Sequence, residues 1–293
     1  MRVRWTSPLA TGTCRLMTGA AEWIGQVGQA WAHEWTRTDR AFAPLTQRLL
    51  AALDEIAPER GRCIDIGCGA GETAIALAAL RPDLAIVGAD ISDDLIAAAR
   101  QRSSAPNLAF IAGDAVATAA AQAPIDLFIS RHGVMFFDDP AAAFTALRDA
   151  AARGARLLFT CFRDWSLNSF ISDLAPLLGG GPPPADQPGP FAFADEGHVR
   201  AILATSGWTD VQAEPIDFAF RVGEGPDPVA DGVAFLSHIG PAARALREWP
   251  QAERPALLAA LADRCRARLN GDAVDFPAAA WLWSASAPAK GTP

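Results

Sequence analysis

The sequence predicts an α/β fold built around a parallel sheet. Five short apolar segments alternate with helices of about ten residues, the pattern of repeated strand–helix–strand units. Three glycines at alternate positions, Gly67, Gly69 and Gly71, follow the first of these segments. Hydrophobic residues make up 51% of the 293 residues and charged residues 20%, a composition that can bury a large core.

Helices are expected ahead of the sheet. Residues 23–56 have helical periodicity, and Trp31 and Trp35 lie one turn apart on a shared face. Pro44 suits the first turn of a second helix. The expected strands are then 63–66, 84–89, 108–112, 125–130 and 155–161, separated by helices at 72–80, at 93–102, in an alanine-rich stretch ending near 122, and at 141–151.

The C-terminal half is less regular. Residues 179–190 are rich in glycine and proline and predict a loop. Further helices are expected at 194–205, 229–248 and 251–269, and further strands at 211–222 and 276–286.

Composition narrows the possible partners. The net charge is −8 and no cluster of Lys and Arg stands out, which disfavours nucleic acid. No apolar run is long enough for a membrane span, and no signal peptide is evident, so we expect a cytoplasmic protein without a membrane partner. Five scattered cysteines without a CxxC pair agree with a reducing compartment, and four isolated histidines predict no metal site.

The glycine segment carries the strongest chemical signal. It reads Asp65-Ile66-Gly67-Cys68-Gly69-Ala70-Gly71 at the end of an apolar strand and before a helix. Gly67 permits a tight turn, Gly69 lets a ligand approach the backbone, and Gly71 lets the helix begin close to the strand. An ordinary tight turn between strand and helix is the alternative interpretation. The third glycine comes one residue earlier than in the dinucleotide-binding fingerprint.

This D-x-G-x-G-x-G pattern resembles the first motif of class I S-adenosylmethionine-dependent methyltransferases of the small-molecule type. The resemblance implies a Rossmann-like, doubly wound, seven-stranded sheet, mostly parallel, with an antiparallel last strand hairpinned with the strand at 211–222. It also implies S-adenosylmethionine as cofactor, S-adenosylhomocysteine as product, and a loop around Cys68 that cradles the amino-acid half of the cofactor. The cofactor ammonium needs an acceptor there, and Asp65 is a carboxylate in this loop.

Two further acidic residues end the next strands. Asp90, followed by Ile91, can accept hydrogen bonds from both ribose hydroxyls; its alternative role as a helix cap is already served by Ser92. The resemblance implies that Asp114, followed by Ala115, binds the adenine amino group. Asp114 as a helix N-cap is the alternative.

The fourth strand ends in a longer match. Residues 130–140 read SRHGVMFFDDP and closely resemble the fourth-strand motif of one large methyltransferase subgroup, which would direct Ser130, Arg131 and His132 toward cofactor and substrate. Asp139 is expected to cap the next helix rather than to bind a metal. At the N-terminus, Gly28-Gln29-Ala30-Trp31 resembles an element that folds over the cofactor, so Trp31 either lines the methionine side or anchors the core.

Methyl transfer requires alignment more than acid–base chemistry, because the sulfonium leaving group is neutral once it departs. If the acceptor is a hydroxyl or a protonated amine, His132 is the candidate base; a wall residue is the alternative. His33 is a weaker candidate for the site, and His198 and His238 are expected on helix surfaces. The acceptor is expected to be a small, fairly apolar molecule, and the residues expected to line its pocket, each of which could equally be core, are Phe162, Trp165, Phe170, Phe191, Phe193, Phe235 and Leu236.

Two other functions stay open at this point. One is a non-catalytic regulatory protein that binds S-adenosylmethionine, and the other is an NAD(P)-dependent oxidoreductase, although the chain has no tyrosine for a Tyr-x-x-x-Lys pair. The oligomeric state stays open too. The expected organisation is a loose N-terminus (1–20), an N-terminal helical lid (21–57), a cofactor-binding core (58–165), a region of loop, helix and sixth strand (166–225), a helical lid insertion (226–270) and a last strand with tail (271–293).

Overall fold

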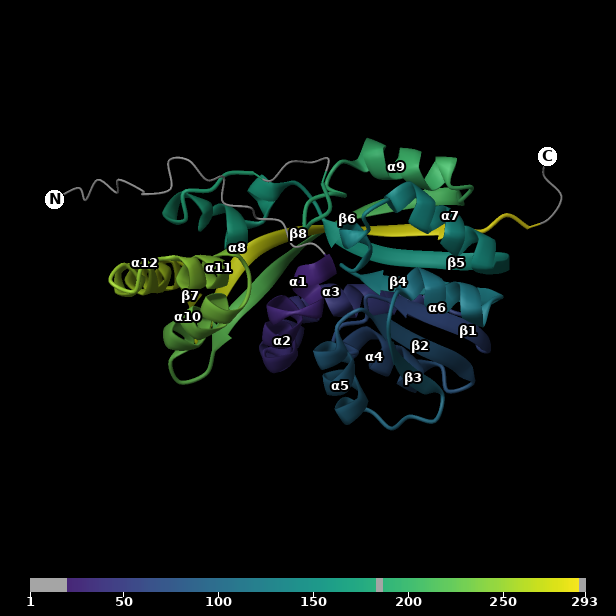
Figure 1. Ribbon diagram of the computed structural model, residues 1–293, viewed down its shortest axis with the longest axis horizontal. Helices are drawn as coiled ribbons and strands as arrows, with labels where there is room; N and C mark the ends of the chain where they lie inside the picture. Colours follow the sequence, from purple (N-terminus) through teal and green to yellow (C-terminus); the bar gives the residue numbers. More distant parts are fainter. Residues whose placement is uncertain (1–19, 183–186, 290–293) are drawn as a thin grey trace.

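A single twisted sheet runs through the protein (Figure 1). The structure, a computed structural model, describes residues 20–182 and 187–289. The main strand order is β3-β2-β1-β4-β5-β8-β6, and the two-residue β7 pairs with β8. The strands are β1 (Gly61–Ile66), β2 (Leu84–Asp90), β3 (Leu108–Ala112), β4 (Ile125–Arg131), β5 (Ala151–Phe162), β6 (Thr209–Glu224), β7 (Leu269–Asn270) and β8 (Ala273–Ser286).

Helices cover both faces of this sheet. One face packs against α3 (Trp35–Ile56), α4 (Glu72–Leu80) and α5 (Asp93–Arg102), through a core that includes Leu49, Leu77 and Ile96. The other face packs against α6 (Ala115–Gln122), α7 (Pro140–Ala150) and α9 (Glu196–Thr205), through a core that includes Phe144 and Leu203. The doubly wound, mostly parallel architecture is therefore confirmed.

The C-terminal strand lies inside the sheet rather than at its edge. β8 runs antiparallel to both β5 and β6. The expected hairpin between 211–222 and the last strand is thus confirmed, and residues 226–270 lie between its two strands in sequence. Trp283 of β8 is fully buried and stacks on Phe159 of β5. The sheet has one strand more than expected, because β7 adds a short pairing beside the end of β8.

Two helical groups meet beyond the carboxyl ends of the parallel strands (Figure 1). The first consists of α1 (Ala20–Ile24), α2 (Gln26–His33) and the start of α3, and the second of α10 (Pro228–His238), α11 (Pro241–Glu248) and α12 (Arg254–Ala267). Shorter turns complete the fold: η1 (Val134–Phe136), η2 (Trp165–Leu167), α8 (Ser169–Ser172) and η3 (Ala175–Leu177).

Two predicted helix boundaries are wrong. Pro44 lies inside α3 rather than in a first turn, because the helix runs on through a buried stripe that includes Ala41, Leu45 and Leu49. The single helix expected at 229–248 is two helices, since Gly240 adopts a φ of +80° between α10 and α11. The expected loose N-terminus lies outside the described residues apart from the first residue of α1, and so does the central part of the expected loop at 179–190.

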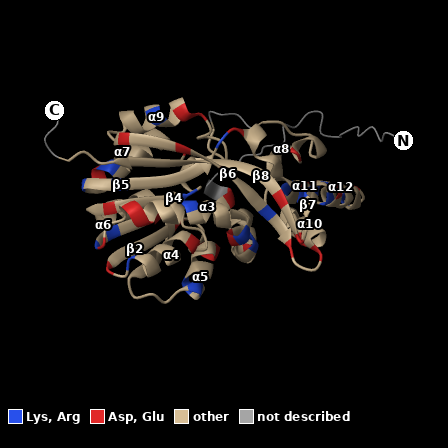
Figure 2. Cartoon of the chain, turned by 180° about the vertical axis from the view of Figure 1, so that it is seen from behind, with Lys and Arg blue, Asp and Glu red and all other residues tan. Residues whose placement is uncertain are grey.

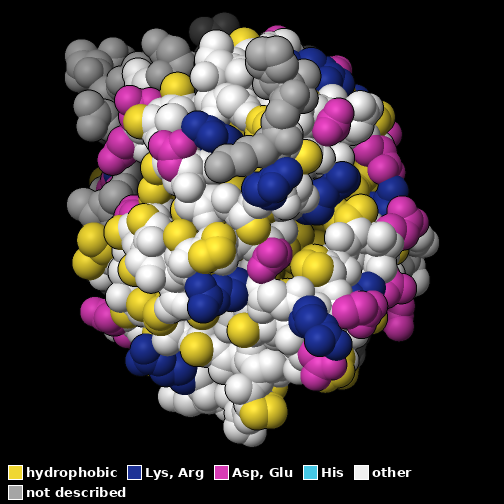
Figure 3. Space-filling model, turned by 90° about the vertical axis from the view of Figure 1, so that its right-hand side faces the viewer, with side chains coloured by type: hydrophobic (Ala, Val, Ile, Leu, Met, Phe, Trp, Pro, Cys, Tyr) yellow, Lys and Arg dark blue, Asp and Glu magenta, His cyan; other side chains and the backbone are white. Residues whose placement is uncertain are grey.

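Lys, Arg, Asp and Glu residues are distributed over many helices and strands (Figure 2). On the face shown in Figure 3, charged side chains of both signs are interspersed, and no patch of one sign dominates that face. In the described part of the chain no helix is long and apolar enough to cross a membrane.

Candidate active site

A cavity of about 380 Å³ lies at the carboxyl ends of β1, β2 and β4. Open α/β sheets bind their ligands at this edge. The glycine loop after β1 forms one end of the cavity, and residues of α1–α3 and α10–α11 cover it. The helical segments that the sequence placed before and after the core thus share one chamber with the glycine motif.

The glycine loop uses its glycines for different purposes. Gly67 has a φ of +63°, and a Cβ there would lie 2.9 Å from the Cα of Gly133, so this position serves close backbone packing. Gly69 has a φ of +55°, but an added Cβ would meet no atom within 4 Å. The backbone at Gly69 therefore faces open space on the cavity wall, where a ligand can approach it closely.

Two buried carboxylates flank this loop. Asp65 is 1% exposed, and neither of its carboxylate oxygens has a hydrogen-bond partner among the described residues. Burial raises the pKa of Asp65 to about 7, and Asp90 adds to this shift, whereas Arg131 and the backbone N–H of Ala74 in α4 oppose it. Asp90 is fixed instead, because its oxygens accept hydrogen bonds from the N–H groups of Gly69 and Ser92, both at 2.9 Å. Burial also raises the pKa of Asp90.

A network of charged residues ties α3 to the glycine loop. Arg131 donates to Thr46 Oγ1 at 2.7 Å and to the carboxylate of Glu72, and it lies 3.8 Å from Asp39. Arg102 pairs with the same Asp39 and donates to the carbonyl oxygen of Ala70 in the loop, at 2.6 Å. Burial and the nearby Glu72 raise the pKa of Asp39 to about 6. Arg131 thus reaches the cavity from β4 while it holds this network together.

His132 is a buried, neutral imidazole in the cavity wall. Its φ of +67° is unusual for a residue other than glycine and turns the side chain out of the strand direction. Nδ1 lies 2.8 Å from Thr160 Oγ1, whereas Nε2 is buried without a hydrogen-bond partner among the described residues. Burial, with Arg131 adding to it, lowers the pKa of His132 to about 3. A group with this pKa is uncharged at neutral pH.

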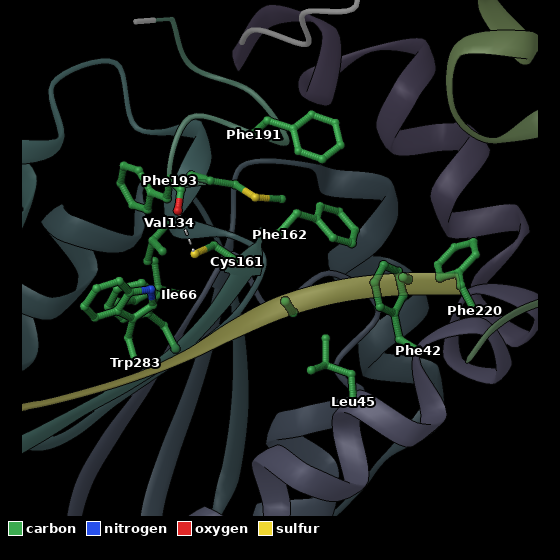
Figure 4. Packing of buried hydrophobic residues seen from close by; sticks show 14 of the residues in the cluster. Phe42, Leu45, Ile66, Val134, Cys161, Phe162, Phe191, Phe193, Phe220 and Trp283 are labelled. Carbon is green, nitrogen blue, oxygen red and sulfur yellow. Dashed lines mark hydrogen bonds between the residues drawn. The ribbon is translucent and has the colours of Figure 1, made fainter. Parts of the chain in front are cut away.

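Phenylalanine rings form the wall beyond His132. The rings of Phe42, Phe162, Phe191 and Phe220 follow one another in contact, with neighbouring ring centroids 5.0 to 6.1 Å apart (Figure 4). His132 meets Phe162 edge to face with ring centroids 4.1 Å apart. Phe170, Phe235 and Leu236 also line the cavity, as the sequence suggested. Phe193 and Trp165 do not: both pack against the main core, and Phe193 is 1% exposed.

Comparisons with known proteins agree with this site. The family described as a methyltransferase domain matches residues 63–154, which include the glycine loop, Asp90 and His132. A malonyl-[acyl-carrier protein] O-methyltransferase of Xylella fastidiosa is 33% identical over 133 residues, 45% of this chain and 45% of that enzyme. The chain thus matches less than half of the length of that relative. A trans-aconitate 2-methyltransferase of Methylobacterium radiotolerans is 28% identical over 80% of this chain and 76% of that enzyme.

The comparisons support a class I S-adenosylmethionine-dependent methyltransferase, with the family match confined to residues 63–154. Among solved structures, phosphoethanolamine N-methyltransferase 2 of Haemonchus contortus, in complex with S-adenosyl-L-methionine, has a similar fold. The TM-score is 0.52 at 15% identity, and the match covers 93% of this chain and 60% of that one.

Most residues that the methyltransferase motifs single out reach the cavity. The lining includes Trp31, Asp65, Gly67, Cys68, Gly69, Asp90, Ile91, Asp114, Ala115, Arg131 and His132. Asp114 also caps α6 by accepting a hydrogen bond from the N–H of Ala117 at 2.7 Å, which is the alternative role expected for it.

Two predicted site residues do not reach the cavity. Ser130 is fully buried beneath the glycine loop, where its hydroxyl donates to the carbonyl oxygen of Ile66 at 2.7 Å and accepts from the N–H of Gly133 at 3.1 Å. Gly71 begins α4, and its backbone packs against the ring of Phe110. Both shape the loop, and neither lines the cavity.

Sequence reasoning missed several cavity residues on the covering helices. They are Trp23, Trp35, Thr38, Asp39, His238, Arg244 and Arg247. His238 had been expected on a helix surface, and it is half-exposed, but its Nδ1 faces the buried Glu34. His33 is 79% exposed and does not line the cavity. Among the described residues, no cluster of three or more His, Cys, Asp and Glu side chains could hold a metal ion.

Proposed function

We propose that this chain binds S-adenosylmethionine in the cavity and transfers its methyl group to a small, largely apolar molecule. The observation that carries the proposal is Asp65. A buried carboxylate without a partner is costly, and it is stabilised when a ligand cation pairs with it. The α-ammonium group of S-adenosylmethionine is such a cation. The open space at Gly69 fits the same ligand, because it admits close contact with the backbone.

The other proposed cofactor contacts come mostly from residues at or just after the carboxyl ends of the parallel strands. The two backbone N–H groups that hold Asp90 leave it further lone pairs, which fit the two ribose hydroxyls. Asp114 and Ala115 border the place for adenine, next along the sheet edge. Trp31 and Ile91 supply apolar contacts from α2 and from the end of β2. These assignments are proposals from position and chemistry.

The cofactor supplies a methyl group on a positively charged sulfur atom. The protein then has to align the acceptor with this group and exclude water. The phenylalanine rings and the covering helices line much of the cavity and would limit the access of water to it. We place the acceptor against Phe162, Phe170 and Phe220, with His132 beside its reacting atom. Since His132 is neutral, it orients the acceptor by a hydrogen bond and takes a proton only from a strongly acidic methylated product.

The residues that line the cavity indicate the chemical class of the acceptor. Eight phenylalanines line the cavity, and they favour an apolar body over a charged polymer: Phe42, Phe136, Phe137, Phe162, Phe170, Phe191, Phe220 and Phe235. The names of the relatives above include both a free metabolite, trans-aconitate, and a carrier-bound malonyl group. A small acceptor agrees with the name of the trans-aconitate enzyme and with the volume of the cavity.

Calorimetric titration with S-adenosylhomocysteine tests the proposal. We expect binding to the wild-type chain, and a loss of at least tenfold in affinity for Asp65→Asn, because the neutral amide cannot pair with the ammonium. Asp149→Asn, on the exposed end of α7, is the matched control and should bind as the wild type does. No binding to the folded wild type would contradict the proposal. Transfer of a labelled methyl group to any member of an acceptor panel separates an enzyme from a non-catalytic binding protein.

A further inference from the structure

Hydrogen bonds and ion pairs between side chains join the two helical groups that cover the cavity. Arg244 of α11 pairs with Glu22 of α1 at 2.9 Å. His238, at the end of α10, lies with Nδ1 2.7 Å from Oε1 of Glu34. Asp231 of α10 pairs with both Arg37 and Arg40 of α3, each at 2.7 Å. These contacts bridge segments about 200 residues apart in the sequence.

Among these residues, Glu34 is buried at the junction between α2 and α3. It follows α2 and precedes α3, so the angle between the two helices is set at this residue. Its side chain is 2% exposed, and its other oxygen accepts from Arg37 of α3 at 2.8 Å. A buried carboxylate with two partners is held far more firmly than a surface ion pair.

The helices joined by this contact, α2 and α10, cover different ends of the cavity. α2 carries Gly28, whose backbone packs so closely on Ser92 that a Cβ would lie 2.2 Å from Ser92 Oγ. α2 thereby closes over the end that contains Asp90. α10 carries Phe235 and Leu236, which form part of the aromatic wall, one turn before His238.

We propose that Glu34 and His238 are positioning residues whose contact couples closure of α2 over the cofactor to the placement of the acceptor wall on α10. This inference rests on the proposed function. Neither residue is assigned a contact with the reacting atoms. The contact fixes α2 through Glu34, the residue that follows it, and α10 through its last residue, so a change at His238 reaches the cofactor end of the cavity.

Substitution of His238 tests the coupling, with affinity for S-adenosylhomocysteine measured by calorimetry on the full chain. His238→Ala removes the hydrogen bond to Glu34 and should weaken binding about five- to tenfold, the range expected for loss of one such bond. His238→Asn should retain most of the affinity, because an asparagine amide can donate from nearly the same place as Nδ1. His198→Ala, on the exposed side of α9, is the matched control and should leave the affinity unchanged.

A double-mutant cycle completes the test. Glu34→Gln combined with His238→Ala should bind S-adenosylhomocysteine no more weakly than the weaker single variant, since both changes alter the same contact between Glu34 and His238. Equal affinity of His238→Ala and the wild type would overturn the inference, and so would equal losses in the Ala and Asn variants. If the wild type itself fails to bind S-adenosylhomocysteine, the proposed function fails first, which is a distinct result.

Discussion

Burial shifts the pKa values of two cavity residues in opposite directions. It raises the pKa of Asp65 to about 7, because the carboxylate loses its hydration, and it lowers the pKa of His132 to about 3, because the imidazolium does. Both groups are therefore driven toward their neutral forms in the free protein. A bound cation reverses this effect for Asp65, whereas nothing described near His132 favours its charge.

We predict that Asp65→Asn stabilises the free protein at pH 8. The folded-state pKa of Asp65 lies above the value of about 3.9 for an unfolded chain, so the native state binds the proton more tightly. Ionisation of Asp65 therefore lowers the free energy of unfolding as the pH rises from about 4 to about 7. Replacement by Asn removes this loss, which amounts to up to about 4 kcal/mol. Chemical denaturation at pH 8 measures it; a less stable variant would contradict the account.

The same pKa predicts how ligand binding depends on pH. The ammonium of S-adenosylhomocysteine pairs with ionised Asp65, so affinity should fall as the pH is lowered from 8 to 6, through the pKa of about 7. Calorimetric titrations at several pH values follow this change. In Asp65→Asn the dependence over this range should largely vanish. An affinity that rises at lower pH would be incompatible with the assigned role.

We expect the imidazole of His132 to stay neutral from pH 7.5 down to pH 5. Burial among phenylalanines and the adjacent Arg131 keep its pKa near 3. Nitrogen and carbon chemical shifts in an NMR titration report the charge, and His132→Asn identifies the signal, because asparagine tolerates the positive φ. A midpoint near 6.5 for this signal would show that the site is wetter than the structure implies.

At the scale of elements, the sequence predicted the parallel part of the sheet well. The strands ending at Ile66, Asp90 and Arg131 were found within a residue or two, because each is a short apolar run followed by a turn signal. Pro44 misled the prediction, since proline usually opens a helix. Burial of the apolar residues of α3 stabilises the helix by more than the loss of the one backbone hydrogen bond that Pro44 cannot donate. The Gly240-Pro241 pair was the local signal that could have divided α10 from α11.

Docking of α2 gives a prediction at this scale. Gly28→Ala would place a Cβ 2.2 Å from Ser92 Oγ and from the carbonyl oxygen of Trp23, so α2 must move away from the end of β2. Such overpacking costs about 1–3 kcal/mol. If α2 closes over the cofactor, affinity for S-adenosylhomocysteine should fall about tenfold, as measured by calorimetry.

A second helical glycine provides the control for this variant. Gly197→Ala lies near the start of α9, where the added Cβ meets only a side-chain oxygen at 3.3 Å. We expect its affinity to equal that of the wild type. Equal affinities for all three proteins would remove α2 from the binding site.

At the scale of the whole molecule, the cavity is made by segments far apart in the sequence. The glycine loop and Asp90 could be assigned in advance, because a parallel sheet brings its carboxyl ends to one edge. Thr38, Asp39 and His238 could not, because their exposure to the cavity depends on how α3 and α10 cross the sheet edge. No local pattern encodes a packing between helices about 200 residues apart.

The proposed cofactor site also predicts which ligands stabilise the protein. S-adenosylhomocysteine at a hundredfold excess over its dissociation constant should stabilise the protein by about 2.7 kcal/mol, whereas NAD and NADP should not. Thermal unfolding with each ligand measures this difference. Stabilisation by NAD or NADP alone would point to an oxidoreductase and against the family chemistry.

The most direct measurement is a crystal structure of the chain with S-adenosylhomocysteine. The account predicts the ligand ammonium beside the carboxylate of Asp65, the ribose hydroxyls on Asp90, and the sulfur atom directed toward His132 and the phenylalanine wall. A ligand bound elsewhere, or one in this cavity with Asp65 still without a partner, would contradict it.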